Sequence, residues 1–181
     1  VEFSLVLFVG MILHGFFSEC LVHAPGVILS NANYVKKVVF PLEILPPAAL
    51  GSALFHAAIS FLVLLGLFMV LHGLPPPTIL AVPLLWVPLV LVAMGTSWFL
   101  ASLGVYVRDV GQIASVLATI LLFVSPVFYP ATAVPPGMCW IYQVNPLAIT
   151  IGQMRDAVLW GQWPDVHVLA VYGLLSFFFA W

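Results

Sequence analysis

The chain has 181 residues, of which 64% are hydrophobic and 6% are charged, with a formal net charge of −2 and a mean hydropathy of +1.23. A soluble domain carries roughly 25% charged residues, so this chain cannot cover a surface in water. The composition predicts an integral membrane protein. Only four Lys and Arg residues are present in the whole sequence, and they form no basic patch for nucleic acid.

The apolar run over residues 3–29 predicts a first transmembrane pass. Its second half carries Glu19, and a carboxylate at membrane depth costs roughly 2.5–3.5 kcal/mol when it faces lipid. We therefore expect Glu19 to face other helices or a watery cavity. Two interpretations stay open: a contact in a channel or between helices, or an interfacial carboxylate near the cytoplasmic end.

A polar segment at residues 31–46 follows this run and holds Lys36 and Lys37. Basic residues in short loops mark the cytoplasmic side, so these lysines set the orientation of the chain. Asn31 or Asn33 is placed to cap a short interfacial helix. An ordinary cytoplasmic loop is the alternative interpretation. Prolines then break the helix and turn the chain back, at Pro41, Pro46 and Pro47.

The next 64 residues, 44–107, contain no Asp, Glu, Lys or Arg. One pass needs about 20 residues, so this stretch predicts two passes, at about 46–71 and 79–105. Three consecutive prolines in the segment 72–78 predict an outer turn between them. Small residues at the start of the second pass permit close approach of a neighbouring helix. His56 is expected to pack between helices rather than to bind a ligand.

A fourth pass is expected at about 111–129, after a return to the cytoplasmic side at 108–109, and prolines end it. The apolar stretches in the outer segment 130–165 are too short to cross the membrane and return. Re-entrant or interfacial helices fit it better, and such backbone is tolerated only against protein or water. Arg155 is one basic residue on the outer side, which weakens the orientation rule without overturning it. Residues 166–181 are a fifth, short pass, and both chain ends look cut.

The sequence lacks the motifs that carry catalysis, phosphate binding or metal binding in known enzymes. Asp165 and His167 are the one pair that suggests an intramembrane enzyme, and we interpret them as interfacial polar residues. The sequence therefore predicts a transport subunit with no catalytic residues and no metal ligands. Its energy source is expected on another chain.

Four stretches, in order along the chain, resemble the permease subunits of type-2 ABC transporters that export O-antigen, capsule and teichoic-acid polymers. They are Gly-Phe-Phe-Ser-Glu at 15–19, Lys-Lys-Val-Val-Phe-Pro-Leu-Glu-Ile-Leu-Pro at 36–46, Tyr-Val-Arg-Asp-Val at 106–110, and Ser-Pro-Val-Phe-Tyr-Pro at 125–130 followed by Asn145-Pro146. Each stretch alone is weak, but four in the right order make a specific match.

The resemblance implies an all-α integral membrane protein, a polytopic helical bundle with six transmembrane helices in the full family fold. This chain, residues 1–181, would be one transmembrane domain with five of them, lacking the N-terminal amphipathic helix and the first transmembrane helix. The family also implies a homodimer in the bacterial cytoplasmic (inner) membrane with two copies of an ABC ATP-binding subunit. ATP and Mg would bind to that partner, and this chain would hold no cofactor.

By the same resemblance, residues 31–46 would be the cytoplasmic coupling segment, and residues 135–143 and 147–160 would be outer re-entrant helices that gate the channel. The implied substrate is a lipid-linked polysaccharide. The alternatives are a drug or another lipid, or an intramembrane enzyme acting on lipid-linked sugars. The residues expected to contact the ATPase are Asn33, Tyr34, Lys36, Lys37, Val38, Phe40, Pro41 and Glu43. The channel or gate candidates are Phe16, Phe17, Glu19, Phe128, Tyr129, Trp140 and Tyr142.

Overall fold

The computed structural model describes residues 3–31, 42–107, 109–129 and 145–181, and within these ranges the regular structure is entirely helical. This confirms the expected all-α bundle. The helices, with 3-10 turns marked η, are α1 (Phe3–His23), η1 (Ala24–Gly26), α2 (Val27–Ser30), η2 (Leu42–Ile44), α4 (Leu45–His72), η3 (Pro77–Ala81), α5 (Val82–Tyr106), α6 (Val110–Val124), α8 (Pro146–Leu159) and α9 (Val166–Ala180).

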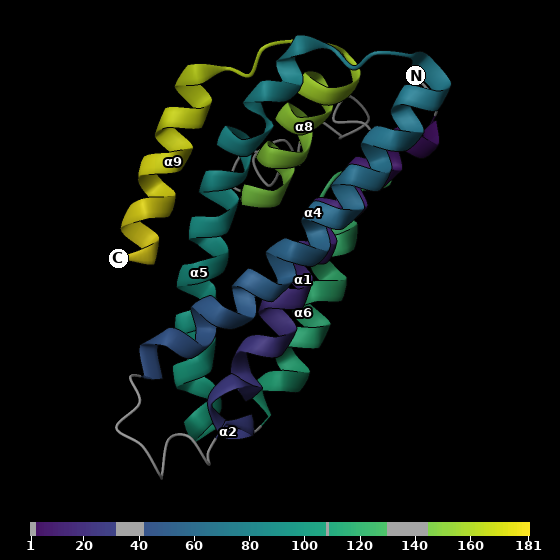
Figure 1. Ribbon diagram of the computed structural model, residues 1–181. Helices are drawn as coiled ribbons and strands as arrows, with labels where there is room; N and C mark the ends of the chain where they lie inside the picture. Colours follow the sequence, from purple (N-terminus) through teal and green to yellow (C-terminus); the bar gives the residue numbers. More distant parts are fainter. Residues whose placement is uncertain (1–2, 32–41, 108, 130–144) are drawn as a thin grey trace.

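The long helices run back and forth between two ends of the bundle (Figure 1). We call them the Asn31 end, where α2 stops and α4 starts, and the Gly73 end, where α4 stops. Helices α1 and α5 form the central pair. Helices α4 and α6 lie against α1, α9 lies against α5, and α8 packs on both α1 and α5 (Figure 1).

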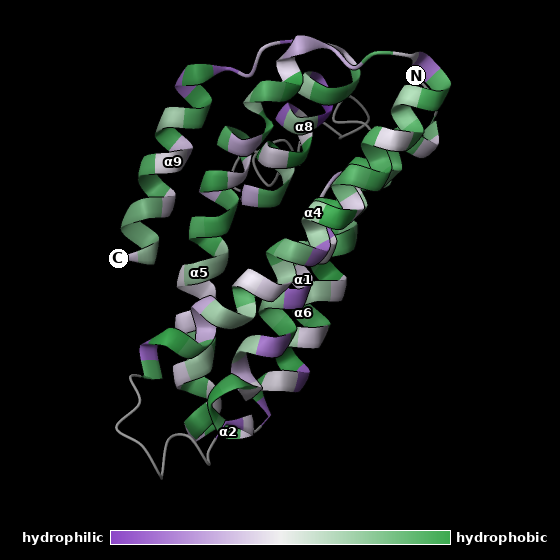
Figure 2. Cartoon of the chain, in the orientation of Figure 1, coloured by the Kyte–Doolittle hydropathy of each residue, from purple (hydrophilic) through white to green (hydrophobic). Residues whose placement is uncertain are grey.

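Three helical segments are long and apolar enough to cross a membrane, 3–30, 42–72 and 77–106, and two shorter apolar helices are α6 and α9. Their positions follow the five passes expected from the sequence. Apolar residues cover their outward surfaces, as expected where lipid rather than water is the solvent (Figure 2). Two passes differ from the expectation, the first by an internal break and the fourth by an earlier end, and a proline explains each case.

The first difference is in the first pass, which was expected as one helix and is broken at η1 by Pro25. Proline lacks the N–H that would continue the α-helical hydrogen bonds. The second difference is in the fourth pass, which ends at Val124 rather than near 129. Ser125 precedes Pro126 and has ψ 148, the extended conformation that a following proline favours.

Small residues bring the central helices into close contact. A Cβ built at Gly104 of α5 would collide with the backbone carbonyl oxygen of Pro25 in η1. On α4, Ala53 and Ala57 are buried, and this helix packs against α1. The expectation that small residues at the start of α4 permit close helix packing therefore holds for these two alanines.

Hydrogen bonds join the end of α6 to the start of α8. The Asn145 side chain caps α8 by accepting from the Leu147 N–H at 3.0 Å, and its amide donates to the Ser125 hydroxyl at 2.9 Å. Pro146 follows at the first helical position, where its missing N–H costs nothing. Both Asn145 and Ser125 are buried, so this contact fixes where α8 begins.

Arg155 of α8 is 4% exposed, and its guanidinium donates to backbone carbonyls of other segments. Nε lies 3.1 Å from the Val6 oxygen of α1, Nη2 lies 2.8 Å from the Val127 oxygen, and Nη1 lies 3.4 Å from the Tyr129 oxygen. Gly10 makes room, since a Cβ there would lie 2.9 Å from Nη2. Arg155 is thus a buried anchor of α8 rather than a residue of the outer surface.

We expect Gly104→Ala to lower the free energy of unfolding by about 1–3 kcal/mol, because the added methyl group meets rigid backbone at Pro25. The matched control is Gly66→Ala in α4, where nothing lies within 4 Å of the added Cβ. The control should leave stability unchanged or raise it by roughly 0.5–1 kcal/mol. Unfolding in mixed micelles followed by circular dichroism measures both, and equal effects would contradict the close contact.

We expect Arg155→Met to destabilise the bundle by about 3 kcal/mol or more, because hydrogen bonds from a charged group contribute roughly 1.5–3 kcal/mol each. Gln153→Met, on the same helix and half-buried, is the control and should change stability little. Thermal unfolding of the detergent-solubilised variants, followed by size-exclusion chromatography, compares them. Equal midpoints for the two variants would show that the guanidinium contacts contribute nothing.

Candidate functional site

The Asn31 end carries the segment that the sequence predicts to contact an ATPase. Most of that prediction lies outside the described residues: Asn33, Tyr34, Lys36, Lys37, Val38, Phe40 and Pro41. Glu43 is described, in η2, and its side chain is exposed at this end of the bundle. Asn31 donates from its side-chain amide to the Val27 carbonyl at 2.8 Å, so here it closes α2. The role of these residues stays a prediction.

Helix α5 contacts the chain on both sides of the stretch 32–41, the middle of this segment. On the side that precedes it, Pro25 lies against Gly104. On the side that follows it, the Trp98 indole N–H donates to the Glu43 carbonyl at 3.2 Å. Pro46 is buried in the first turn of α4, as expected of a residue that fixes the direction of the chain there. A displacement of the segment would therefore be transmitted to α5.

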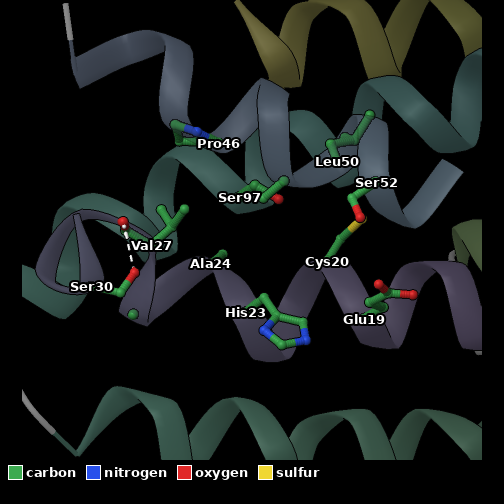
Figure 3. A pocket seen from close by; sticks show the side chains of 12 residues that line it. Glu19, Cys20, His23, Ala24, Val27, Ser30, Pro46, Leu50, Ser52 and Ser97 are labelled. Atoms are coloured by element: carbon green, nitrogen blue, oxygen red, sulfur yellow. Dashed lines mark hydrogen bonds between the residues drawn. The ribbon is translucent and has the colours of Figure 1, made fainter. Parts of the chain in front are cut away.

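A cavity of about 290 Å³ lies beside these contacts, between α1, α2, α4 and α5 (Figure 3). Polar side chains line part of it and small apolar ones line the rest. The lining residues are Glu19, Cys20, His23, Ala24, Gly26, Val27, Ser30, Pro46, Ala49, Leu50, Ser52 and Ser97. Cys20 is a buried free thiol. No His, Cys, Asp or Glu group of three that would hold a metal ion occurs in the part of the chain that the structure describes.

Glu19 lies at the edge of this cavity and bonds to α4. Its Oε1 lies 3.0 Å from Nδ1 of His56, which is the donor in this contact, and the two side chains are 30% and 61% exposed. Glu19 thus faces a neighbouring helix and a cavity, the two environments expected for it. The contact links α1 to α4. Its part in a channel stays a prediction.

The predicted channel aromatics lie in three different environments. Phe16 and Phe17 are buried in the core of the bundle, and Phe16 contacts Trp86 edge to face at 5.3 Å. These two therefore pack within the described fold rather than on a free surface. Phe128 is 41% exposed, and the Tyr129 hydroxyl donates to the Val124 carbonyl at 3.0 Å. The remaining candidates, Trp140 and Tyr142, lie outside the described residues.

Asp156, near the end of α8, and Asp165, at the start of α9, are the described acids at the Gly73 end. Asp165 caps α9 by accepting from the His167 backbone N–H at 2.9 Å, so this pair has the geometry of a helix cap. Burial raises the pKa of the Asp156 carboxyl, and the adjacent Arg155 charge lowers it to a smaller extent. Neither the Asp165 cap nor the neighbouring pair Arg155 and Asp156 brings together a nucleophile and a base, as a catalytic site requires.

We expect a double-mutant cycle with Glu19→Ala and His56→Ala to give a coupling free energy of about 0.6 kcal/mol, the average for hydrogen bonds between membrane helices. The pair is only partly buried, which limits its strength. The measurement is unfolding in mixed micelles of the wild type, both single variants and the double variant. A coupling indistinguishable from zero would contradict a contact between these side chains in the membrane.

Comparison with known proteins places the chain among transporters. The family model for "ABC-2 type transporter" matches residues 2–159. An O-antigen export system permease from Klebsiella pneumoniae is 24% identical over 94% of this chain and 66% of its own length. A permease of the same name from Myxococcus xanthus is 23% identical, and a polysialic acid transport protein from Escherichia coli is 24% identical, over 99% and 98% of this chain and 70% of each relative.

The chain therefore spans about two thirds of the length of these relatives. The family model extends over the helices from α1 to α8, and the alignment with the Myxococcus xanthus permease, over 99% of this chain, also takes in most of α9. The apolar helices of this chain fit a membrane-spanning protein, which is the class of protein that the matching family model describes. The chain belongs to the ABC-2 type transporter family.

Proposed function

We propose that this chain is the membrane-spanning permease subunit of an ATP-driven exporter that moves a lipid-linked polysaccharide across the bacterial cytoplasmic membrane. The observation that carries the proposal is the similarity, over 94–99% of the chain, to relatives named for O-antigen export and polysialic acid transport. ATP hydrolysis takes place on a separate ATP-binding subunit, as in the resemblance described above. Two copies of this chain and two ATP-binding subunits form the transporter.

The Asn31 end faces the cytoplasm in this proposal. Lys36 and Lys37 lie in the short connection at this end, and basic residues in short loops are retained on the cytoplasmic side. The Gly73 end then faces outward, and α8 lies in the outer half. Since α8 is largely buried and anchored through Arg155, it is the fixed part of the outer half.

Force from the ATP-binding subunit enters at residues 31–46 and reaches the bundle through α5. The contacts of Trp98 with Glu43 and of Gly104 with Pro25 lie on opposite sides of the stretch 32–41, the first within this segment and the second before it. When the ATP-binding subunits close, the segment moves and α5 moves with it. The path for the polymer opens between the two copies of the chain, with exposed aromatic residues such as Phe128 along it.

The experiment expresses the full-length protein with its ATP-binding partner and compares wild type with the Lys36→Glu/Lys37→Glu/Phe40→Ala variant. We expect the variant to insert into the membrane and to lose co-purification of the partner and stimulation of its ATPase activity. Reversing two charges and removing one apolar anchor acts on the contact itself, because interface energy is concentrated in few residues.

The control changes the opposite end of the bundle, with His72→Glu and Leu74→Ala, where Leu74 is 92% exposed. This variant should co-purify the partner as the wild type does. Loss of the partner in both variants would mean that the Asn31 end is not the specific contact. A wild-type chain that binds no ATP-binding subunit would contradict the proposed function itself.

A further inference from the structure

We propose that the cavity beside Glu19 binds one uncharged sugar ring of the polymer as it enters from the cytoplasmic side. This inference rests on the proposed function, because it names the substrate chemistry that this cavity fits. Figure 3 shows the cavity between the α1–α2 segment and the helices α4 and α5. Every residue that lines it is described.

Ser97 is the residue that points to a ligand. It lies on α5, is 3% exposed, and its side chain lines the cavity (Figure 3). Other serines and threonines of the same helix donate to carbonyls of the preceding turn, as Thr96 and Ser102 do. Within the described ranges, the Ser97 hydroxyl has no such partner. The Ser97 hydroxyl faces the cavity without a partner among the described residues, so a hydroxyl group of a ligand there can both donate to it and accept from it.

The other polar groups of the cavity fit the hydroxyl groups of a sugar. Glu19 bonds to His56 through Oε1, which leaves Oε2 as an acceptor. His23 and Ser52 add groups that both donate and accept. No Lys or Arg lines the cavity, so a phosphate or another anion would meet the Glu19 carboxylate without a compensating cation. The polar chemistry therefore favours an uncharged ligand with several hydroxyl groups.

The apolar part of the lining matches the other face of a sugar ring. Ala24, Val27, Pro46 and Leu50 present carbon atoms to the cavity beside the polar groups. A pyranose ring likewise has hydroxyl groups at its edge and C–H groups on its faces. A metal ion would use only the polar groups, and a lipid chain would use only the apolar ones. A sugar ring uses both.

Size limits the ligand to one ring. The cavity of about 290 Å³ corresponds to about ten water molecules at roughly 30 Å³ each. It lies at the lower limit of small-molecule pockets, which run from about 300 to 1,000 Å³. The cavity also lies beside the flanks of residues 31–46, so a sugar bound here contacts the same helices that receive force from the ATPase.

The first test uses a thiol in the cavity as a reporter. In the full-length transporter with its ATP-binding subunit, Cys20→Ser and Cys139→Ser remove the two thiols of this sequence, and Ala49→Cys introduces one in the cavity lining. The rate of modification by a small water-soluble methanethiosulfonate reagent is measured alone, with methyl glucoside, and with sodium pyrophosphate. We expect methyl glucoside to slow the modification severalfold and pyrophosphate to leave it unchanged.

Each other result would overturn the proposal. Equal slowing by both probes, or slowing by pyrophosphate alone, would reject an uncharged ligand. A thiol that reacts at one rate in all three samples would identify a cavity that holds water only. A thiol that never reacts would show that the cavity is closed. A Leu74→Cys reporter at the Gly73 end should react at one rate throughout.

The second test compares polysaccharide export by Ser97→Leu and Ser102→Leu. Both place the same side chain on α5, but Ser102 is on the exposed face. We expect Ser97→Leu to export at least about fivefold more slowly, the effect of losing one net hydrogen bond, while the ATP-binding subunit still co-purifies. Equal export by the two variants would overturn the inference alone. A wild type that exports no polysaccharide would contradict the proposed function, and the thiol test would still decide whether the cavity binds a sugar.

Discussion

The guanidinium of Arg155 meets a demand that the membrane places on every break in a helix. Where a helix stops inside an apolar environment, its last carbonyls need donors, because no water is present to supply them. Helix α6 stops at such a place. The turn that follows it leaves the Val127 and Tyr129 carbonyls without helical partners, and Arg155 donates to both. The same side chain also reaches the Val6 carbonyl of α1. The buried guanidinium charge and the carbonyl oxygens that accept from it thus satisfy each other's hydrogen bonds. Helix α8 can therefore lie buried without spanning the bundle.

Helix α5 is the second element on which the arrangement depends. Gly104 admits the backbone of η1, Gly95 lies against Phe179 of α9, and Trp98 holds the Glu43 carbonyl. Lipid provides little hydrophobic driving force between helices, so close contact through small residues is a main source of association. A helix with small residues on several faces contacts several neighbours at once. This is why one helix can contact Pro25 and Glu43, the cavity beside Glu19 and α9.

The sequence predicted the helices well because hydropathy and proline act locally. Charge-free stretches of membrane length set the passes, and the prolines at 75–77 set the turn between α4 and α5. The break at Pro25 was missed, because one proline in an apolar run also occurs inside membrane helices, as Pro88 does in α5. The close contacts of Gly10 with Val127 and of Gly104 with Pro25 could not be predicted, because nothing in the sequence around a glycine identifies the distant segment that packs against it.

The residues of the candidate site were harder to predict, since their roles depend on distant partners. Arg155 was expected on the outer side with no partner beyond Asp156 in view, because its acceptors lie 26 to 149 residues away in the chain. The channel role expected for Phe16 and Phe17 stays a prediction, because an aromatic residue in an apolar run has the same pattern in a core, where both residues lie. Glu19 was placed correctly beside a helix and a cavity, because the cost of a carboxylate facing lipid leaves few other environments.

The anchoring of α8 also sets an order of assembly. Helices such as α4 are apolar all round and satisfy their own backbone, so they insert into a membrane as separate units. Helix α8 has 14 residues and carries both Arg155 and Asp156, so it is neither long enough nor apolar enough to do the same. Its guanidinium finds acceptors only after α1 and the turn after α6 have come together. The folding of this protein therefore includes a docking step, in which a polar helix enters a site that α1 and the turn after α6 have already formed.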